Sequence, residues 1–206
     1  MPPTDPSGPK RYDRAYFDAW YRAPEHAVGS RAALSRNVAL AVAVTESILQ
    51  RTLRSVLDVG CGEGRWQPVL HRLRPRAAYL GIDPSEYAVE RFGTRRNLRL
   101  GSFEALELHD FARPFDLVVC SDVLHYLTVE QFHRGLPALV DRTGGVALLE
   151  VFTSADEIEG DEVEFHRRPP SWYRREFARV GLHPLGLQFH VPEEVAEVLD
   201  AMDRPG

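Results

Sequence analysis

A glycine-rich segment flanked by carboxylates has the clearest chemical potential in the sequence. Residues 58–64 read DVGCGEG, and Asp83 follows about 20 residues farther along. Glycines allow a positive φ and let a ligand approach the backbone, while a carboxylate at that distance suits the hydroxyls of a ribose. The spacing therefore predicts a nucleoside site. The alternatives are a tight structural turn for the glycines and, for Asp83, a cap on the helix that begins at Pro84 and Ser85.

The spacing of the glycines distinguishes this segment from a dinucleotide-binding loop. It reads G-x-G-x-G instead of G-x-G-x-x-G, and Arg65 stands where a small residue would let a helix approach a pyrophosphate. Asp58, just before the glycines, would repel a diphosphate but would suit a ligand that carries an ammonium group. The charge pattern thus favours S-adenosylmethionine over NAD.

Apolar runs that alternate with helical segments must position these residues. We expect strands at 55–60, 77–82, 98–103, 115–120, 146–152 and 185–191, and helices at 12–21, 32–53, 64–73, 85–92, 128–140, 170–180 and 192–202. Thr128 and Gln131 match a capping box. Continuous apolar strands separated by helices indicate an α/β, doubly wound, mostly parallel sheet of six or seven strands with helices on both faces.

The N-terminal region divides into a tail and a helical extension. Residues 1–10 hold four prolines and one glycine, a composition that predicts a disordered tail. Residues 11–206 are expected to form a single domain, with a helical cap at 11–53 and a Rossmann-like core at 55–206. The aromatic face of 12–21 predicts either fixed packing on the core or a mobile cover over the ligand.

Composition narrows the class of protein. Hydrophobic residues make up 44% and charged residues 27%, as in an ordinary globular protein, and the net charge of −5 offers no basic field for nucleic acid. Two cysteines favour a reducing compartment, and we find neither a signal segment nor a stretch of membrane-spanning length. We expect a cytoplasmic protein with a small-molecule substrate, no nucleic-acid or membrane partner and, given the spacing of its possible ligands, no metal.

Four segments carry a resemblance to a known family. VLDVGCGEG, LGIDPS, FDLVVCSDVLHYL and GGVALLEVF occur in this order and resemble the motifs of class I S-adenosylmethionine-dependent methyltransferases, over about residues 55–152. The resemblance implies an enzyme that transfers a methyl group to O, N, S or C of an acceptor and releases S-adenosyl-L-homocysteine. The family's Asn/Asp-Pro-Pro-Tyr/Phe tetrad is missing after residue 120, which points to small-molecule acceptors.

The resemblance also implies roles for individual residues. Asp58, Gly60, Cys61 and Gly62 would contact the methionine portion and the ribose, and Asp83 would hold the ribose hydroxyls. Ser102 stands where the family usually has an aspartate for the adenine, so these contacts depart from the pattern. The full implied cofactor-binding set is Asp58, Gly60, Cys61, Gly62, Asp83, Pro84, Ser102, Phe103 and Ser121. Phe103 would cover the adenine or belong to the core.

One histidine is the candidate catalytic base. His125 comes just after the fourth family strand, and a histidine with a near-neutral pKa suits proton removal from a hydroxyl acceptor. Alternatively, His125 caps a helix or contacts the cofactor. For the whole chain, the alternatives are a non-catalytic Rossmann-like cofactor-binding module and an NAD-dependent oxidoreductase. The acidic run at 156–162 is typical of a solvated loop, or it attracts a cationic substrate.

Overall fold

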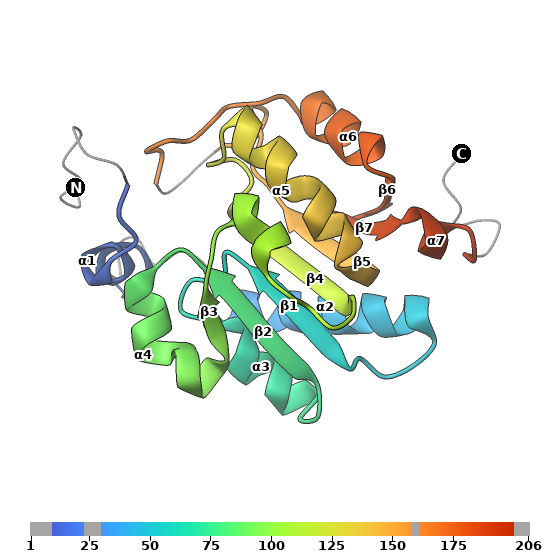
Figure 1. Ribbon diagram of the computed structural model, residues 1–206, viewed down its shortest axis with the longest axis horizontal. Helices are drawn as coiled ribbons and strands as arrows, with labels where there is room; N and C mark the ends of the chain where they lie inside the picture. The colour runs from blue at the N-terminus through green and yellow to red at the C-terminus, as the bar shows by residue number, and fades with distance from the viewer. Residues whose placement is uncertain (1–9, 23–29, 158–160, 200–206) are drawn as a thin grey trace.

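Seven strands form one twisted sheet through the middle of the molecule (Figure 1). The computed structural model describes residues 10–22, 30–157 and 161–199. The strands are β1 (Ser55–Val59), β2 (Ala78–Asp83), β3 (Leu98–Leu100), β4 (Phe115–Ser121), β5 (Thr143–Glu150), β6 (Leu182–Gly186) and β7 (Phe189–Pro192). Their order is β3-β2-β1-β4-β5-β7-β6, in which β7 is antiparallel to β5 and to β6. The order reverses between β1 and β4, where doubly wound sheets open a ligand crevice.

Helices cover both faces of this sheet. They are α1 (Arg14–Phe17), the π-helical η1 (Asp18–Arg22), α2 (Arg31–Leu49), α3 (Trp66–Leu73), α4 (Glu86–Arg96), the 3-10 helix η2 (Phe103–Leu108), α5 (Val129–Asp141), α6 (Pro170–Arg179) and α7 (Glu193–Ala196). In Figure 1, α5 and α6 lie in front of the sheet, and α2 and α3 lie behind it. The predicted doubly wound α/β fold with an N-terminal helical extension is confirmed.

Local signals fix the ends of several helices. The Thr128 hydroxyl accepts from the Gln131 backbone N–H, and the Gln131 side chain accepts from the Thr128 N–H, so the predicted capping box is confirmed. The Ser30 hydroxyl caps α2 by accepting from the Ala33 N–H. At the other end, Gln50 takes a left-handed conformation and stops the helix, which is shorter than the predicted 32–53.

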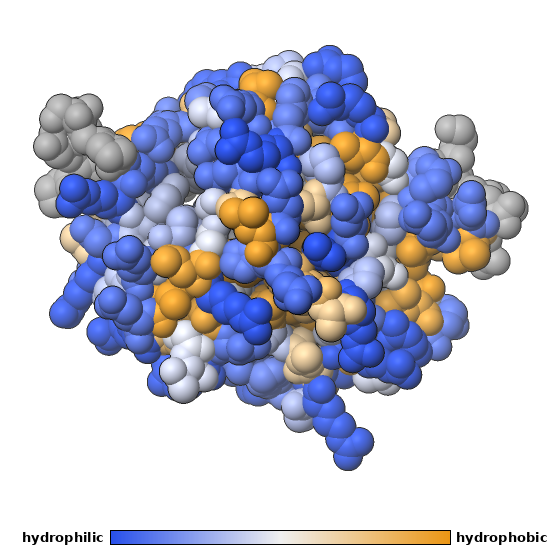
Figure 2. Space-filling model, viewed as in Figure 1, coloured by the Kyte–Doolittle hydropathy of each residue, from blue (hydrophilic) through white to orange (hydrophobic). Residues whose placement is uncertain are grey.

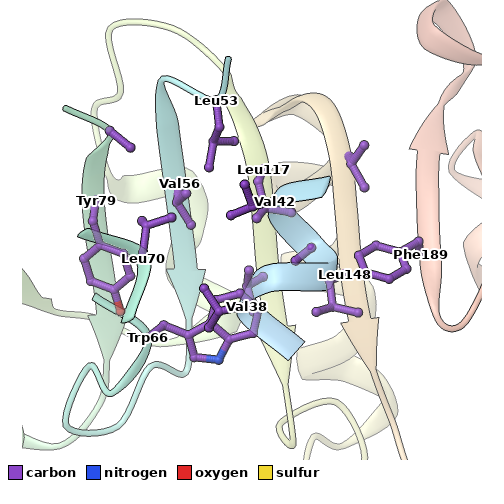
Figure 3. Close-up of a cluster of buried hydrophobic side chains, with 14 of the residues drawn as sticks. Val38, Val42, Leu53, Val56, Trp66, Leu70, Tyr79, Leu117, Leu148 and Phe189 are labelled. Atoms are coloured by element: carbon purple, nitrogen blue, oxygen red, sulfur yellow. The ribbon is translucent and has the colours of Figure 1, made fainter. Parts of the chain in front are cut away.

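Two apolar layers hold the sheet between the helices. Behind it, Val38 and Val42 of α2 pack with Trp66 of α3 against β1, β4 and β5, as Figure 3 shows. On the other side, Phe132 of α5 and Phe177 of α6 pack on the opposite faces of the same strands. Because both faces are covered, the inner strands carry the continuous apolar runs from which a parallel sheet was predicted.

The C-terminal part of the sheet differs from its prediction. The single strand expected at 185–191 is wrong: β6 and β7 form a hairpin. Leu187 and Gln188 turn the chain with φ of 49° and 65°. This turn lacks the usual Asn-Gly signal. The strand predicted at 98–103 ends at Leu100, after which the backbone leads into η2.

By its length and composition, α2 meets the test for a helix that could span a membrane. The view that no stretch has spanning length is wrong, because α2 has 19 residues with a mean hydropathy of 1.3, although this test is also met by core helices. Its Val38, Ala41 and Val42 are buried against the sheet. The tail predicted at 1–10, apart from Lys10, and the end of the helix predicted at 192–202 lie outside the described residues.

Candidate functional site

The glycine loop after β1 folds back onto the end of β2. The Gly60 and Cys61 N–H groups donate to the Ile82 carbonyl at 2.8 and 3.2 Å, and the Gly62 N–H donates to Asp83 Oδ2 at 2.6 Å. Gly60 has a φ of +71° and lies against Val123, and Gly62 has a φ of +54°. A side chain at either position would be strained, and at Gly60 it would also collide with Val123. The loop therefore exposes bare backbone at the carboxyl edge of the sheet.

Two adjoining cavities open over this loop. One has a volume of 340 Å³ and the other of 250 Å³, and Phe17, Tyr21, Gly60, Gly62 and Asp122 line both. The predicted cofactor-binding residues all belong to these linings: Asp58, Cys61 and Ser121 to the larger cavity, Asp83, Pro84, Ser102 and Phe103 to the smaller one, and Gly60 and Gly62 to both. Residues from four strand ends thus meet at one site, as the crevice position predicts.

Asp58 is a buried carboxylate beneath the larger cavity. Its Oδ2 accepts a 2.6 Å hydrogen bond from the Tyr79 hydroxyl. Burial raises the pKa of Asp58 to about 7, and the nearby charge of Asp83 adds to this increase, while the Tyr79 hydrogen bond opposes it. A cation beside Asp58 would favour its ionised form, so this position suits a positively charged ligand group.

Asp83 joins the glycine loop to the start of α4. Its two oxygens accept from the N–H groups of Gly62 and Ser85, at 2.6 and 2.9 Å. The cap of α4 is Ser85, whose hydroxyl accepts from the Ala88 N–H. Burial raises the pKa of Asp83, and the two backbone hydrogen bonds oppose this rise. The carboxylate lines the smaller cavity and retains lone pairs for a ligand.

Ser102 and Phe103 lie where the chain leaves β3. Phe103 is 4% exposed and packs against Phe132 and Gly135 in the core, so it contributes only an edge to the smaller cavity. Ser102 is half-buried and lines the same cavity. Phe103 therefore belongs to the core, and its contact with the adenine stays a prediction.

His125 lies below the site instead of in it. The imidazole is completely buried, stands 4.4 Å from the ring of Tyr126 and 4.7 Å from that of Phe165, and lines neither cavity. Its Nδ1 accepts a 3.3 Å hydrogen bond from the Phe152 N–H. Its Nε2 is 3.1 Å from Asp122 Oδ1. Among the described residues, His125 thus reaches the site through Asp122.

Two acidic residues at strand ends line the site but were not among the predicted site residues. Asp122 follows β4 and Glu150 ends β5, and both line the larger cavity. The rule that selected Asp58 and Asp83, polar residues at the carboxyl ends of parallel strands, would have found them. Asp122 also has a φ of +60°, an uncommon conformation for a residue other than glycine.

The N-terminal segment covers the glycine loop. Phe17 is 2% exposed, and one of its ring carbons comes within 3.3 Å of the position that a Gly62 Cβ would occupy. The Ser85 hydroxyl donates to the Tyr12 carbonyl. Arg22 of η1 forms an ion pair with Glu63 of the loop. The predicted aromatic face is therefore packed over the site.

Among the described residues, no group of three or more His, Cys, Asp or Glu side chains could hold a metal ion. In the acidic run, Asp156 and Glu157 are exposed and Glu162 pairs with Arg167, whereas Asp161 is buried. Glu159 lies outside the described residues.

Comparison with known sequences identifies the central part of the chain. Residues 57–146 match a family described as a methyltransferase domain. A stretch of 77 residues, 35% of this chain, is 35% identical to malonyl-(acyl-carrier protein) O-methyltransferase of Legionella pneumophila. The matched stretch spans 27% of the length of that relative.

Solved structures extend the likeness to the fold as a whole. The sugar N-methyltransferase KedS8 from Streptoalloteichus sp. has a TM-score of 0.63 at 18% identity, over 85% of this chain and 92% of its own. Magnesium protoporphyrin IX methyltransferase from Synechocystis, solved with bound S-adenosylhomocysteine, has a TM-score of 0.55 at 16% identity, over 85% and 89%. Residues 57–146 thus match a methyltransferase domain, and the chain shares the α/β fold of these solved methyltransferases.

Proposed function

We propose that this protein transfers a methyl group from S-adenosyl-L-methionine to a nucleophilic atom of a small molecule. The observation that carries the proposal is the pair of adjoining cavities over the glycine loop, with the buried carboxylates of Asp58 and Asp83 in their walls. Residues 11–206 would act as one methyltransferase domain. The small-molecule substrates of the sugar and porphyrin methyltransferases support a small acceptor, and the free cysteines Cys61 and Cys120 support a cytoplasmic location.

The residues of the site fit S-adenosylmethionine. Asp58 and Asp83 both have raised pKa values because they are buried, so a cation between them would relieve an electrostatic cost. Asp58 would hold the ammonium of the methionine portion, and Asp83 would accept hydrogen bonds from the ribose hydroxyls. Ser102 and the edge of Phe103 would border the adenine. When bound, the cofactor supplies a methyl group on a positively charged sulfur.

The chain itself would supply orientation and exclusion of water. In-line alignment of acceptor and methyl group contributes about 7 to 11 kcal/mol to rate enhancement in well-oriented systems. Phe17 and Tyr21, which line both cavities, would keep the reacting atoms aligned and dry. The role of His125 as a base stays a prediction, and its complete burial favours a role through Asp122.

The competing functions predict different ligands. An NAD-dependent oxidoreductase would bring a diphosphate next to Asp58 and Asp83, whereas their charges favour a cation. A non-catalytic binding module would bind S-adenosylmethionine without turnover. Neither alternative is favoured by an observation of its own.

The experiment is a measurement of S-adenosylhomocysteine released by the full chain incubated with S-adenosylmethionine and pools of small amines, alcohols and thiols. We expect release that depends on at least one pool and is lost in Asp83→Ala. Binding of the cofactor without release from any pool would support the non-catalytic module instead.

A further inference from the structure

Two carboxylates that follow neighbouring strands line the larger cavity. Asp122 and Glu150 come from the neighbouring ends of β4 and β5 and line this cavity. In the part of the chain that the structure describes, neither forms an ion pair with a lysine or an arginine; the Ser121 hydroxyl donates to Glu150. Arg65, which lines the same cavity, lies over the ring of Tyr21 at 5.6 Å. The protein therefore leaves negative charge facing this space.

A buried imidazole stands behind one of these carboxylates. Because the Nδ1 of His125 accepts from the Phe152 N–H, the proton of the neutral ring belongs on Nε2. That nitrogen is fully buried and makes no aligned hydrogen bond with a described residue, and the nearest acceptor is Asp122 Oδ1 at 3.1 Å. A buried donor 3.1 Å from an acid that lines the cavity restrains the position of that acid, so His125 is a positioning residue for Asp122.

An apolar groove continues from the carboxylates. A further cavity of 240 Å³ is lined by Leu40, Leu148, Leu187 and Phe189, and it shares Asn37 and Glu150 with the larger cavity. Leu40 is 41% exposed and Leu187 is 75% exposed. The face of the molecule in Figure 2 is largely hydrophilic, with separate hydrophobic patches. Glu150 thus lies at the junction between the larger cavity, which carries the carboxylates, and the apolar groove.

We infer that the methyl acceptor is an apolar small molecule with a protonated amine. This inference rests on the proposed function and names its substrate class. Asp122 and Glu150 would bind the ammonium, and the apolar body would lie along Leu40, Leu187 and Phe189. An alcohol would gain no charge attraction from these acids, and a carboxylic acid would be repelled.

The two carboxylates also provide a group that can remove the proton that the ammonium must lose before it is methylated. Asp122 accepts one proton from the ammonium and frees the lone pair on nitrogen. The nitrogen then forms the new N–C bond while the electron pair of the broken C–S bond stays on sulfur. The product is a methylated ammonium and neutral S-adenosylhomocysteine, and the proton on Asp122 passes to water. Charge and electrons balance without a further reactant.

The test compares three ligands that differ only in their head group. The full chain is saturated with S-adenosylhomocysteine and titrated by calorimetry with octylamine, octanol and octanoate at pH 7.5. We expect octylamine to bind about ten-fold or more tightly than octanol, and octanoate to bind least. Glu150→Gln and Asp122→Asn should each reduce the preference for the amine, whereas Glu90→Gln, an exposed change on α4, should leave it unaltered.

A second comparison tests the groove. Leu187→Ser should weaken octylamine binding several-fold and leave ethylamine binding unchanged, because only the longer chain reaches the groove. Equal affinities for octylamine and octanol in the cofactor-saturated protein would overturn the inference while leaving the proposed function intact. Failure to bind S-adenosylhomocysteine at all would overturn both.

Discussion

The ammonium of Lys10 lies 2.6 Å from Asp161 Oδ2, with 3% and 5% of the two side chains exposed. The same ammonium is 3.6 Å from the centroid of the Tyr126 ring, and the Tyr126 hydroxyl donates to the Asp161 carbonyl. Residues about 150 positions apart in sequence are therefore joined beside the smaller cavity, which Tyr126 lines. This contact fastens the N-terminal segment to the loop that follows β5.

Breaking this contact should open the cover. Lys10→Met leaves Asp161 buried without its cation, a change that typically costs about 3 to 5 kcal/mol when it cannot relax. The cover hypothesis then predicts faster hydrogen exchange across 12–21 and cofactor binding weaker by about ten-fold. Arg11→Met, an exposed change next door, is the control. If exchange across 12–21 is equally slow with and without S-adenosylhomocysteine, the segment is fixed packing and the cover hypothesis fails.

Asp83→Ala should weaken S-adenosylmethionine binding by about 2 kcal/mol or more, because charge-assisted hydrogen bonds to the ribose are lost. The change also removes the acceptors of the Gly62 and Ser85 N–H groups, so a moderate fall in thermal stability should accompany it. Calorimetry and thermal unfolding on the same samples separate the two effects. Asp110→Ala, at an exposed position, serves as the control. An unchanged dissociation constant would leave Asp83 with a structural role only.

The pKa of about 7 at Asp58 predicts opposite pH trends for stability and for binding. Burial raises this pKa above its ordinary value of 3.8, so the stabilising contribution of the protonated group is complete below about pH 4 and is lost as the pH rises to about 7. Cofactor binding through an ammonium needs the ionised form, so it should strengthen by about ten-fold between pH 6 and 8.

Asp58→Asn is the matched variant for both trends. In this variant the free energy of unfolding and the affinity for S-adenosylhomocysteine should both vary less with pH than in the unmodified protein. Calorimetry measures both quantities. Adenosine has no ammonium, and its affinity should not vary in this way even in the unmodified protein. Pairing of Asp58 with the ammonium is disproved if both ligands follow the same pH curve.

His125→Gln should lower turnover without removing the acidic limb of the pH–rate profile, since Asp122 is the group that accepts the proton and His125 only positions it. Gln retains a donor, so His125→Ala should be the more damaging change. Stopped assays between pH 5 and 9 give the comparison. Disappearance of the limb in His125→Gln would identify the imidazole as the base, as first predicted from the sequence.

The sequence predicted the parts of the site that depend on local order along the chain. Asp58, the glycines and Asp83 follow two adjacent parallel strands, so the alternation of apolar runs was enough to bring them to one edge. The contact between Lys10 and Asp161 was not predictable, because it joins distant segments with no periodic signal. The β6–β7 hairpin was missed because Leu187 and Gln188 are unusual residues for a positive φ.

The most direct test of the central claim is a calorimetric titration of the full chain with S-adenosylhomocysteine, compared with NADH under the same conditions. The two buried carboxylates and the G-x-G-x-G loop predict saturable binding of one S-adenosylhomocysteine per chain and no measurable binding of NADH. Binding of NADH, or binding of neither ligand by the folded protein, would contradict the assignment of these cavities to the methyl donor.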